Sequence, residues 1–188
     1  MSQVKSAAIQ TLRGLGLLKL TDVGLYWMRR LRSWPRNRRF RREHPEFATP
    51  PAHLAFDALN HAEWSIYRDS GREHAQVFAR IVSAEEPGDA PLSILEWGCG
   101  PGRLIRHVAE ALPGRAVTMT GADYNHESIA WCREHLPGIR FVENGLMPPL
   151  DLPDDAFDVV YNLSVFTHLS EEAQLAWAAA LRRVPKPG

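Results

Sequence analysis

The sequence has few cysteines and no long apolar run. Only two of its 188 residues are cysteines, Cys99 and Cys132, which is too few for a disulfide scaffold or a zinc site of four thiolates. Near the N-terminus, the apolar stretches 14–18 and 23–28 are far shorter than the roughly 20 residues that a membrane-spanning helix requires. The first 20 residues also lack the apolar segment of a secretory signal peptide. These absences predict a cytoplasmic protein, peripheral to a membrane at most.

A net charge of zero conceals two parts of opposite sign. Residues 1–48 contain 11 basic and three acidic residues, a net charge of +8, whereas residues 49–188 contain 11 basic and 19 acidic residues, a net charge of −8. We therefore expect a basic arm on an acidic body. The arm's apolar residues are loosely helical in spacing over 12–31, and eight arginines follow within 29–42. Such an arm can bind an anionic membrane surface or nucleic acid. The favoured alternative is a solvated helix that packs its leucine and tryptophan face on the body, while its arginines pair with the body's acidic residues.

Prolines separate the arm from the next helical stretch. Pro45, Pro50 and Pro51 break a helix, and residues 52–84 are predicted to be helical, with Gly71 dividing the stretch in two. Tyr67 and Gly71 either close over a ligand as a lid or serve only helix packing. We divide the chain into the arm, 1–48, a helical lid or linker, 49–90, and a core, 91–188.

From residue 91 onwards, short apolar runs alternate with helical patterns. Strands are predicted at 93–97, 116–123, 139–143 and 157–164, and helices at 103–112, 127–136 and 170–184, the last capped by Ser170. This alternation predicts an α/β fold with a doubly wound, mostly parallel sheet and an N-terminal helical extension.

A glycine loop at 98–102 follows the first predicted strand, where such sheets bind ligands. Glycines allow a sharp turn and a close approach of backbone to ligand, and the N-terminus of the next helix offers N–H donors. Asp123 lies 21 residues after Gly102, at the end of the second strand. A carboxylate there suits the two hydroxyls of a ribose. The pattern predicts a site for a nucleoside.

The glycine spacing argues against two common nucleotide sites. A dinucleotide site would need a third glycine at position 103, which is Arg103, and a P-loop would need Lys after Gly102. A dinucleotide-binding oxidoreductase is therefore the less favoured alternative.

Four segments together resemble one family. Residues 94–103, ILEWGCGPGR, resemble motif I of the class I S-adenosylmethionine-dependent methyltransferases. GADY at 121–124, LPDDAFDVV at 152–160 and RRVPKPG at 182–188 are similar to later motifs of that family, with Pro185 where leucine is usual. The resemblance covers residues 91–188 and implies a Rossmann-like methyltransferase fold with S-adenosylmethionine as the cofactor.

The resemblance also implies roles for individual residues. Glu96 and the glycine loop would hold the methionine part of the cofactor, Asp123 the ribose and Tyr124 one face of the adenine. Asn144 would approach the adenine edge, and residues 162–164 would line the pocket near the sulfonium. The implied cofactor-binding set is Glu96, Gly98, Cys99, Gly100, Gly102, Asp123, Tyr124, Asn144, Asn162, Leu163 and Ser164.

Methyl transfer requires positioning of the acceptor, and a base only where the acceptor is a weak nucleophile. His168 is the candidate base, or else it packs against the following helix. Arg103 either meets an acidic acceptor or pairs with a surface acid. The histidines show no metal-ligand spacing, so no metal is predicted. The predicted acceptor is a small molecule or a glycan-type hydroxyl; the alternative is a non-catalytic scaffold whose arm binds a membrane or nucleic acid.

The family's sheet has seven strands, and the pattern here supplies four. The fourth would form an open sheet edge, which proteins normally cover. We therefore expect the chain to be a fragment, truncated after the fourth strand and its helix, or to be completed by another segment.

Overall fold

The computed structural model describes residues 18–187, which form two compact units divided between Ser65 and Ile66. Residues 12–17 of the arm's predicted helical stretch lie outside the described residues. The helices of the N-terminal part are α2 (Leu18–Glu43), α3 (Ala52–Leu59) and α4 (Trp64–Glu85), the last of which begins at the boundary between the units.

Helix α2 runs without interruption through the arginine-rich segment and contains Pro35. It ends two residues before Pro45, as the prolines predict. Its side chains are tied to the segment between α3 and α4, since the Asn37 amide donates to the Ala62 carbonyl oxygen at 2.6 Å and accepts from the Trp64 backbone N–H at 2.9 Å. The described part of the arm is therefore one long helix with a packed side, followed by a short segment that contains Pro45.

The predicted division of residues 52–84 at Gly71 is wrong. The two helices separate at residues 60–63, where Asn60 adopts a left-handed conformation with φ 53° and closes α3. Gly71 lies inside α4, and a Cβ atom there would overlap the backbone carbonyl oxygen of Arg103. The glycine is thus required by a close helix–loop contact and does not end the helix.

Replacing Gly71 by alanine should destabilise the protein, although alanine favours helices. The added methyl group meets a backbone carbonyl, which cannot rotate away, so we expect a loss of about 2 kcal/mol in the free energy of unfolding. Gly24, inside α2, is the matched control because its Cβ position has no atom within 4 Å. Gly24→Ala should be neutral or stabilising by up to about 1 kcal/mol. Urea unfolding measures both variants, and equal stabilities would contradict the packing role of Gly71.

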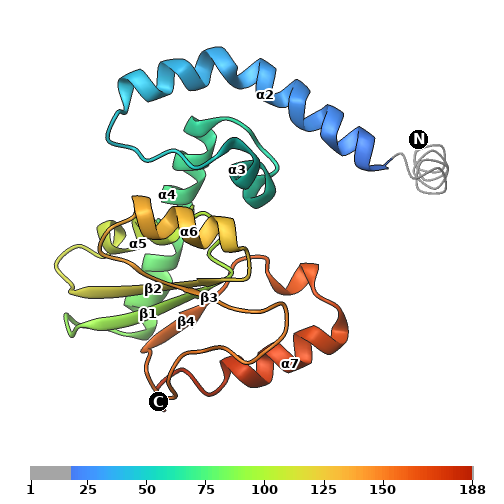
Figure 1. Ribbon diagram of the computed structural model, residues 1–188. Helices are drawn as coiled ribbons and strands as arrows, with labels where there is room; N and C mark the ends of the chain where they lie inside the picture. The colour runs from blue at the N-terminus through green and yellow to red at the C-terminus, as the bar shows by residue number, and fades with distance from the viewer. Residues whose placement is uncertain (1–17, 188) are drawn as a thin grey trace, which may run out of the picture. The chain divides into compact units, whose positions relative to one another are not determined.

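Four parallel strands form the sheet, in the order β3-β2-β1-β4. The chain crosses over between successive strands, so the predicted doubly wound α/β class is confirmed. Helix α6 covers one face of the sheet and α7 the other (Figure 1). The strands are β1 (Leu92–Trp97), β2 (Val117–Asp123), β3 (Arg140–Glu143) and β4 (Val159–Tyr161).

The remaining elements differ from the prediction mainly at their ends. The first core helix starts two residues later than expected and is short, and the fourth strand is reduced to three half-buried residues at the edge of the described sheet. Beside it, Phe157 forms an isolated parallel bridge with Pro185. Ser170 caps the last helix as predicted, accepting from the Ala173 N–H. These elements are α5 (Ile105–Ala111), α6 (His126–His135), the 3₁₀ helix η1 (Phe166–His168) and α7 (Glu171–Leu181).

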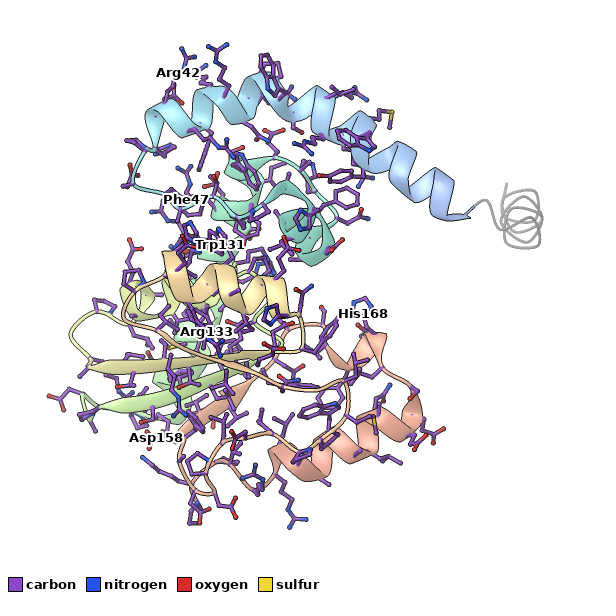
Figure 2. All side chains as sticks on the ribbon, viewed as in Figure 1. Arg42, Phe47, Trp131, Arg133, Asp158 and His168 are labelled. Atoms are coloured by element: carbon purple, nitrogen blue, oxygen red, sulfur yellow. The ribbon has the colours of Figure 1, made fainter. Side chains whose placement is uncertain are left out.

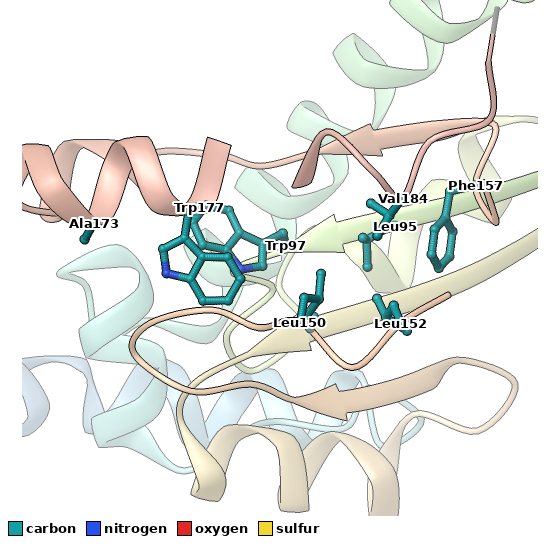
Figure 3. Close-up of a cluster of buried hydrophobic side chains, with 9 residues drawn as sticks. Leu95, Trp97, Leu150, Leu152, Phe157, Ala173, Trp177 and Val184 are labelled. Atoms are coloured by element: carbon teal, nitrogen blue, oxygen red, sulfur yellow. The ribbon is translucent and has the colours of Figure 1, made fainter. Parts of the chain in front are cut away.

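The main apolar core lies between the sheet and α7. Trp97 of β1 and Trp177 of α7 pack with ring centroids 4.7 Å apart (Figure 3), and the indole N–H of Trp177 donates to the Leu146 carbonyl oxygen at 2.9 Å. Side chains of a strand alternate between faces, so Leu95 and Trp97 enter this core whereas Glu96 between them points to the opposite face. The alternation places one buried carboxylate on the other side of β1.

Candidate functional site

The site is built around the glycine loop between β1 and α5. Gly98 and Gly102 have φ of 79° and 71°, in the left-handed region that glycine adopts at least cost. A Cβ on Gly98 would overlap the Val165 side chain, and one on Gly102 would lie 2.5 Å from a methyl group of Leu136. Both positions therefore require glycine for conformation and for space. Because α5 begins only at Ile105, the donors at this point belong to the loop more than to a helix end.

Asp123 fixes the loop to the end of β2. One carboxylate oxygen accepts from the Gly100 N–H at 2.7 Å and the other from the Asn125 N–H at 2.8 Å. The side chain is buried, and burial raises its pKa while the backbone donors lower it. The backbone N–H of Tyr124 is a third donor to this carboxylate, which has about four acceptor sites in all. The carboxylate therefore holds the loop and keeps acceptor capacity.

Side chains of α4 and α5 hold the carbonyl groups of the loop. The Pro101 carbonyl oxygen accepts from the Tyr67 hydroxyl at 2.9 Å and from Arg106 at 3.2 Å, and Arg106 also donates to the Gly102 carbonyl oxygen at 2.8 Å. Tyr67 is fully buried, which supports the packing interpretation over the lid. The role of Arg106 was not predicted. The only feature of the sequence that suggests this role is the spacing of Arg106, which lies four residues, or about one helical turn, after Gly102.

Both cysteines point at the same carbonyl of the loop. The Sγ atoms of Cys99 and Cys132 each lie 3.6 Å from the Gly100 carbonyl oxygen. Burial raises the pKa of Cys99 well above its usual value and that of Cys132 to about 12. Since the thiolate is the nucleophile, these thiols are unreactive at neutral pH and fill space under the loop.

Glu96 is a buried carboxyl group with one phenol partner. Its Oε2 accepts from the Tyr161 hydroxyl at 2.8 Å, and Tyr161 packs on Phe78 of α4 with centroids 4.0 Å apart. Burial raises the pKa of Glu96 to about 8, although Tyr161 and Arg103 act in the opposite direction. The sequence analysis missed Tyr161, which is the β4 partner of Glu96 in the sheet register. Strand order is the signal that would have found it.

The other predicted residues lie at several places around the loop. Tyr124 follows β2 and the residue is 59% exposed. The Oδ1 atom of Asn144 is buried without a hydrogen-bond partner, while its amide donates to the Gly145 carbonyl oxygen at 2.7 Å. Asn162 is half-buried, whereas Leu163 and Ser164 are exposed after β4, with Ser164 at φ 62°. Their cofactor roles stay predictions.

The two residues predicted to serve the acceptor are not brought together by any contact that the structure describes. Arg103 Nη1 lies 3.3 Å from both Ser70 Oγ and His74 Nδ1 on α4. His168 ends η1 and is exposed (Figure 2), and Ser170, two residues further, caps α7. His168 as a base and Arg103 as an acceptor residue stay predictions.

The residues present fit S-adenosylmethionine by three observations. The glycine loop follows the carboxyl end of β1, where parallel α/β sheets bind ligands. Asp123 keeps acceptor capacity, and the orphaned Asn144 Oδ1 can accept from an exocyclic amine. Within residues 18–187, no cluster of three or more His, Cys, Asp or Glu side chains could hold a metal ion. No helix in that range is both long and apolar enough to cross a membrane.

Comparison with known proteins agrees with this geometry. Residues 94–188 match the family model of the methyltransferase domain. A probable S-adenosylmethionine-dependent methyltransferase of Mycolicibacterium smegmatis is 32% identical over 117 residues, which are 62% of this chain and 41% of the relative. A trans-aconitate 2-methyltransferase of Rhodopseudomonas palustris is 32% identical over 107 residues, 53% of this chain and 39% of the relative. The chain thus spans about two-fifths of the length of these relatives.

A solved structure supports the fold. The crystal structure of a putative S-adenosyl-L-methionine-dependent methyltransferase from Methanococcus maripaludis aligns with a TM-score of 0.54 at 13% identity, covering 76% of this chain and 64% of that one. The family model covers half of the chain and contains the glycine loop, Asp123, β2, β3, β4 and all but the first two residues of β1. The predicted resemblance is confirmed, and the chain belongs to the class I S-adenosylmethionine-dependent methyltransferase family.

Proposed function

We propose that this chain binds S-adenosylmethionine at the carboxyl ends of β1 and β2 and directs its methyl group to an acceptor. The observation that carries the proposal is the buried Asp123 carboxylate, held by the Gly100 and Asn125 N–H groups directly beside the exposed ring of Tyr124. Together they offer a ribose acceptor next to a surface on which an adenine can stack. Arg103 in place of a third glycine argues against a dinucleotide.

The proposed binding roles follow from the position of each side chain. The remaining acceptor capacity of Asp123 would serve the ribose, and Asn144 Oδ1 would accept from the adenine amine. Glu96 and the backbone of the 98–102 loop would bind the methionine part. Asn162, Leu163 and Ser164 would line the wall nearest the transferred group. These roles all fall within the proposed core, residues 91–188, which follows the proposed helical lid or linker, 49–90, in the chain.

For the acceptor, we propose a small molecule or a glycan-type hydroxyl. One of the relatives is named for a small molecule, trans-aconitate. The cofactor supplies a methyl group already activated by its sulfonium, so the protein's part is to orient the acceptor and exclude water. A hydroxyl acceptor would need a base, for which His168 is the candidate; an acidic acceptor would need a cation, for which Arg103 is the candidate.

Thermal unfolding with S-adenosylhomocysteine tests the proposal on the full chain. A ligand present at about 100 times its dissociation constant should stabilise the folded state by about 2.7 kcal/mol, which raises the melting temperature visibly. NADH at the same concentration is the control and should leave the melting temperature unchanged. A cooperative transition that S-adenosylhomocysteine does not shift would contradict the proposal.

The anionic membrane surface expected for the basic arm is a separate proposal, because it depends on α2 and not on the glycine loop.

A further inference from the structure

Helix α2 carries an exposed apolar stripe. Trp27, Leu31 and Trp34 are exposed by 51%, 70% and 61% of their surface. They are spaced by four and then three residues, which places them on one face of a helix. Two tryptophans and a leucine left exposed on one face are unusual for a helix that only covers a soluble domain.

A different face of α2 makes the contacts within its own unit. Ser33 and Phe40 are buried, Phe40 packs on Phe47 with ring centroids 5.6 Å apart, and Asn37 binds the segment at residues 62–64. The α2 residues in these contacts are Ser33, Asn37 and Phe40, which are also spaced by four and then three residues. Each lies six positions after the corresponding residue of the exposed stripe. Within the described residues of the unit, 18–65, the packing therefore leaves the stripe of Trp27, Leu31 and Trp34 uncovered.

Arginines border the stripe. The guanidinium of Arg30 lies 5.0 Å from the ring centre of Trp27, and that of Arg38 lies 5.8 Å from the ring centre of Trp34. Between residues 24 and 43 the only acidic residue is Glu43, which pairs with Arg39 at 2.7 Å. Arg42 projects from the C-terminal end of the same helix (Figure 2). The stripe is thus set within an excess of positive charge.

We propose that α2 docks on an anionic membrane surface. Trp27, Leu31 and Trp34 would enter the boundary between headgroups and acyl chains, where tryptophan is favoured, while the bordering arginines bind lipid phosphates. Helix α2 lies parallel to the surface and does not span the bilayer. Binding to nucleic acid would use the same arginines, but it would give Leu31 no partner. The apolar stripe therefore favours the membrane.

Vesicle co-sedimentation of the full chain tests this docking. The protein should bind phosphatidylcholine vesicles that contain phosphatidylglycerol and not vesicles of phosphatidylcholine alone, and binding should weaken as salt rises. Leu31→Ser should weaken binding to the anionic vesicles about tenfold. Leu175→Ser is the matched control, since Leu175 on α7 is exposed by 68% of its surface, and it should bind like the wild type.

Three results would overturn the proposal. They are an absence of binding to anionic vesicles, equal binding to both kinds of vesicle, and equal effects of Leu31→Ser and Leu175→Ser. A further experiment adds duplex DNA as a competitor. If the protein bound DNA more tightly than vesicles, and Leu31→Ser did not change DNA binding, α2 would be assigned to nucleic acid. Circular dichroism of each variant shows that a loss of binding is not a loss of fold. The cofactor-induced thermal shift is unaffected by any of these outcomes.

Discussion

Replacing Asp123 by asparagine should lower the affinity for S-adenosylhomocysteine on the order of a hundredfold, because hydrogen bonds to a charged group contribute about 1.5 to 3 kcal/mol each. The variant should also lose about 2 kcal/mol of folding free energy. The reason is local: an amide NH₂ would face either the Gly100 N–H or the Asn125 N–H, both of which now donate to the carboxylate. Calorimetric titration measures the affinity, and urea unfolding measures the stability.

Asp89→Asn is the control for this variant. Asp89 is exposed in the loop before β1, so its replacement should change neither quantity. If Asp123→Asn lost stability but bound the ligand as tightly as the wild type, Asp123 would only brace the loop. The ribose assignment would then be wrong, while the rest of the cofactor site would stand.

Glu96 should make the protein less stable as the pH rises through the neutral range. Its pKa is about 8 in the folded protein, against an ordinary value of 4.5. Between these two values the folded state holds a proton that the unfolded chain has released, so the free energy of unfolding falls as pH rises. From pH 6.5 to pH 8 the decrease should be on the order of 2 kcal/mol. Well above pH 8, Glu96 is ionised in both the folded and the unfolded state, and its contribution to stability no longer changes with pH.

Glu96→Gln isolates this contribution. The amide oxygen can still accept from the Tyr161 hydroxyl, but the side chain no longer titrates. Urea unfolding at several pH values should therefore show a decrease for the wild type and little change for the variant above pH 6.5. Parallel curves for the two proteins would show that Glu96 is ionised in the folded state at neutral pH.

Below pH 6.5, the wild type must again be compared with Glu96→Gln, because the titration of His107 changes the free energy of unfolding in the opposite direction. Burial lowers the pKa of His107 from 6.5 to about 4. Its contribution to stability is present above pH 6.5 and is lost as the pH falls toward 4, so it rises with pH where that of Glu96 falls. The difference between the wild type and Glu96→Gln cancels His107 and leaves Glu96 alone.

The sequence was informative where the signal is local. The apolar runs located all four strands, and the spacing to Asp123 indicated a carboxylate beside the glycine loop. Ser170 identified the start of α7 because a cap and its helix are adjacent in the chain. Strand periodicity and capping depend on neighbours within a few residues, which a single sequence displays.

Contacts between distant segments were the part that the sequence did not reveal. Glycine is unfavourable inside helices, so Gly71 suggested a helix break. The contact that explains this glycine is with the carbonyl of Arg103, which lies 32 residues away in the sequence. The Glu96–Tyr161 hydrogen bond depends on β4 lying beside β1, which strand positions alone do not specify. Pro35 lies inside α2, and the helix continues past it with contacts to residues 62–64 that only the tertiary structure supplies.

The two thiols near the Gly100 carbonyl oxygen make local opening of the glycine loop measurable. Cys99 and Cys132 are the chain's only cysteines, and both are buried against the glycine loop. A thiol-alkylating reagent can reach them only when the loop or the helices beneath it open. The rate at which the reagent labels the wild-type protein therefore reports local opening at the glycine loop. No reporter group has to be introduced.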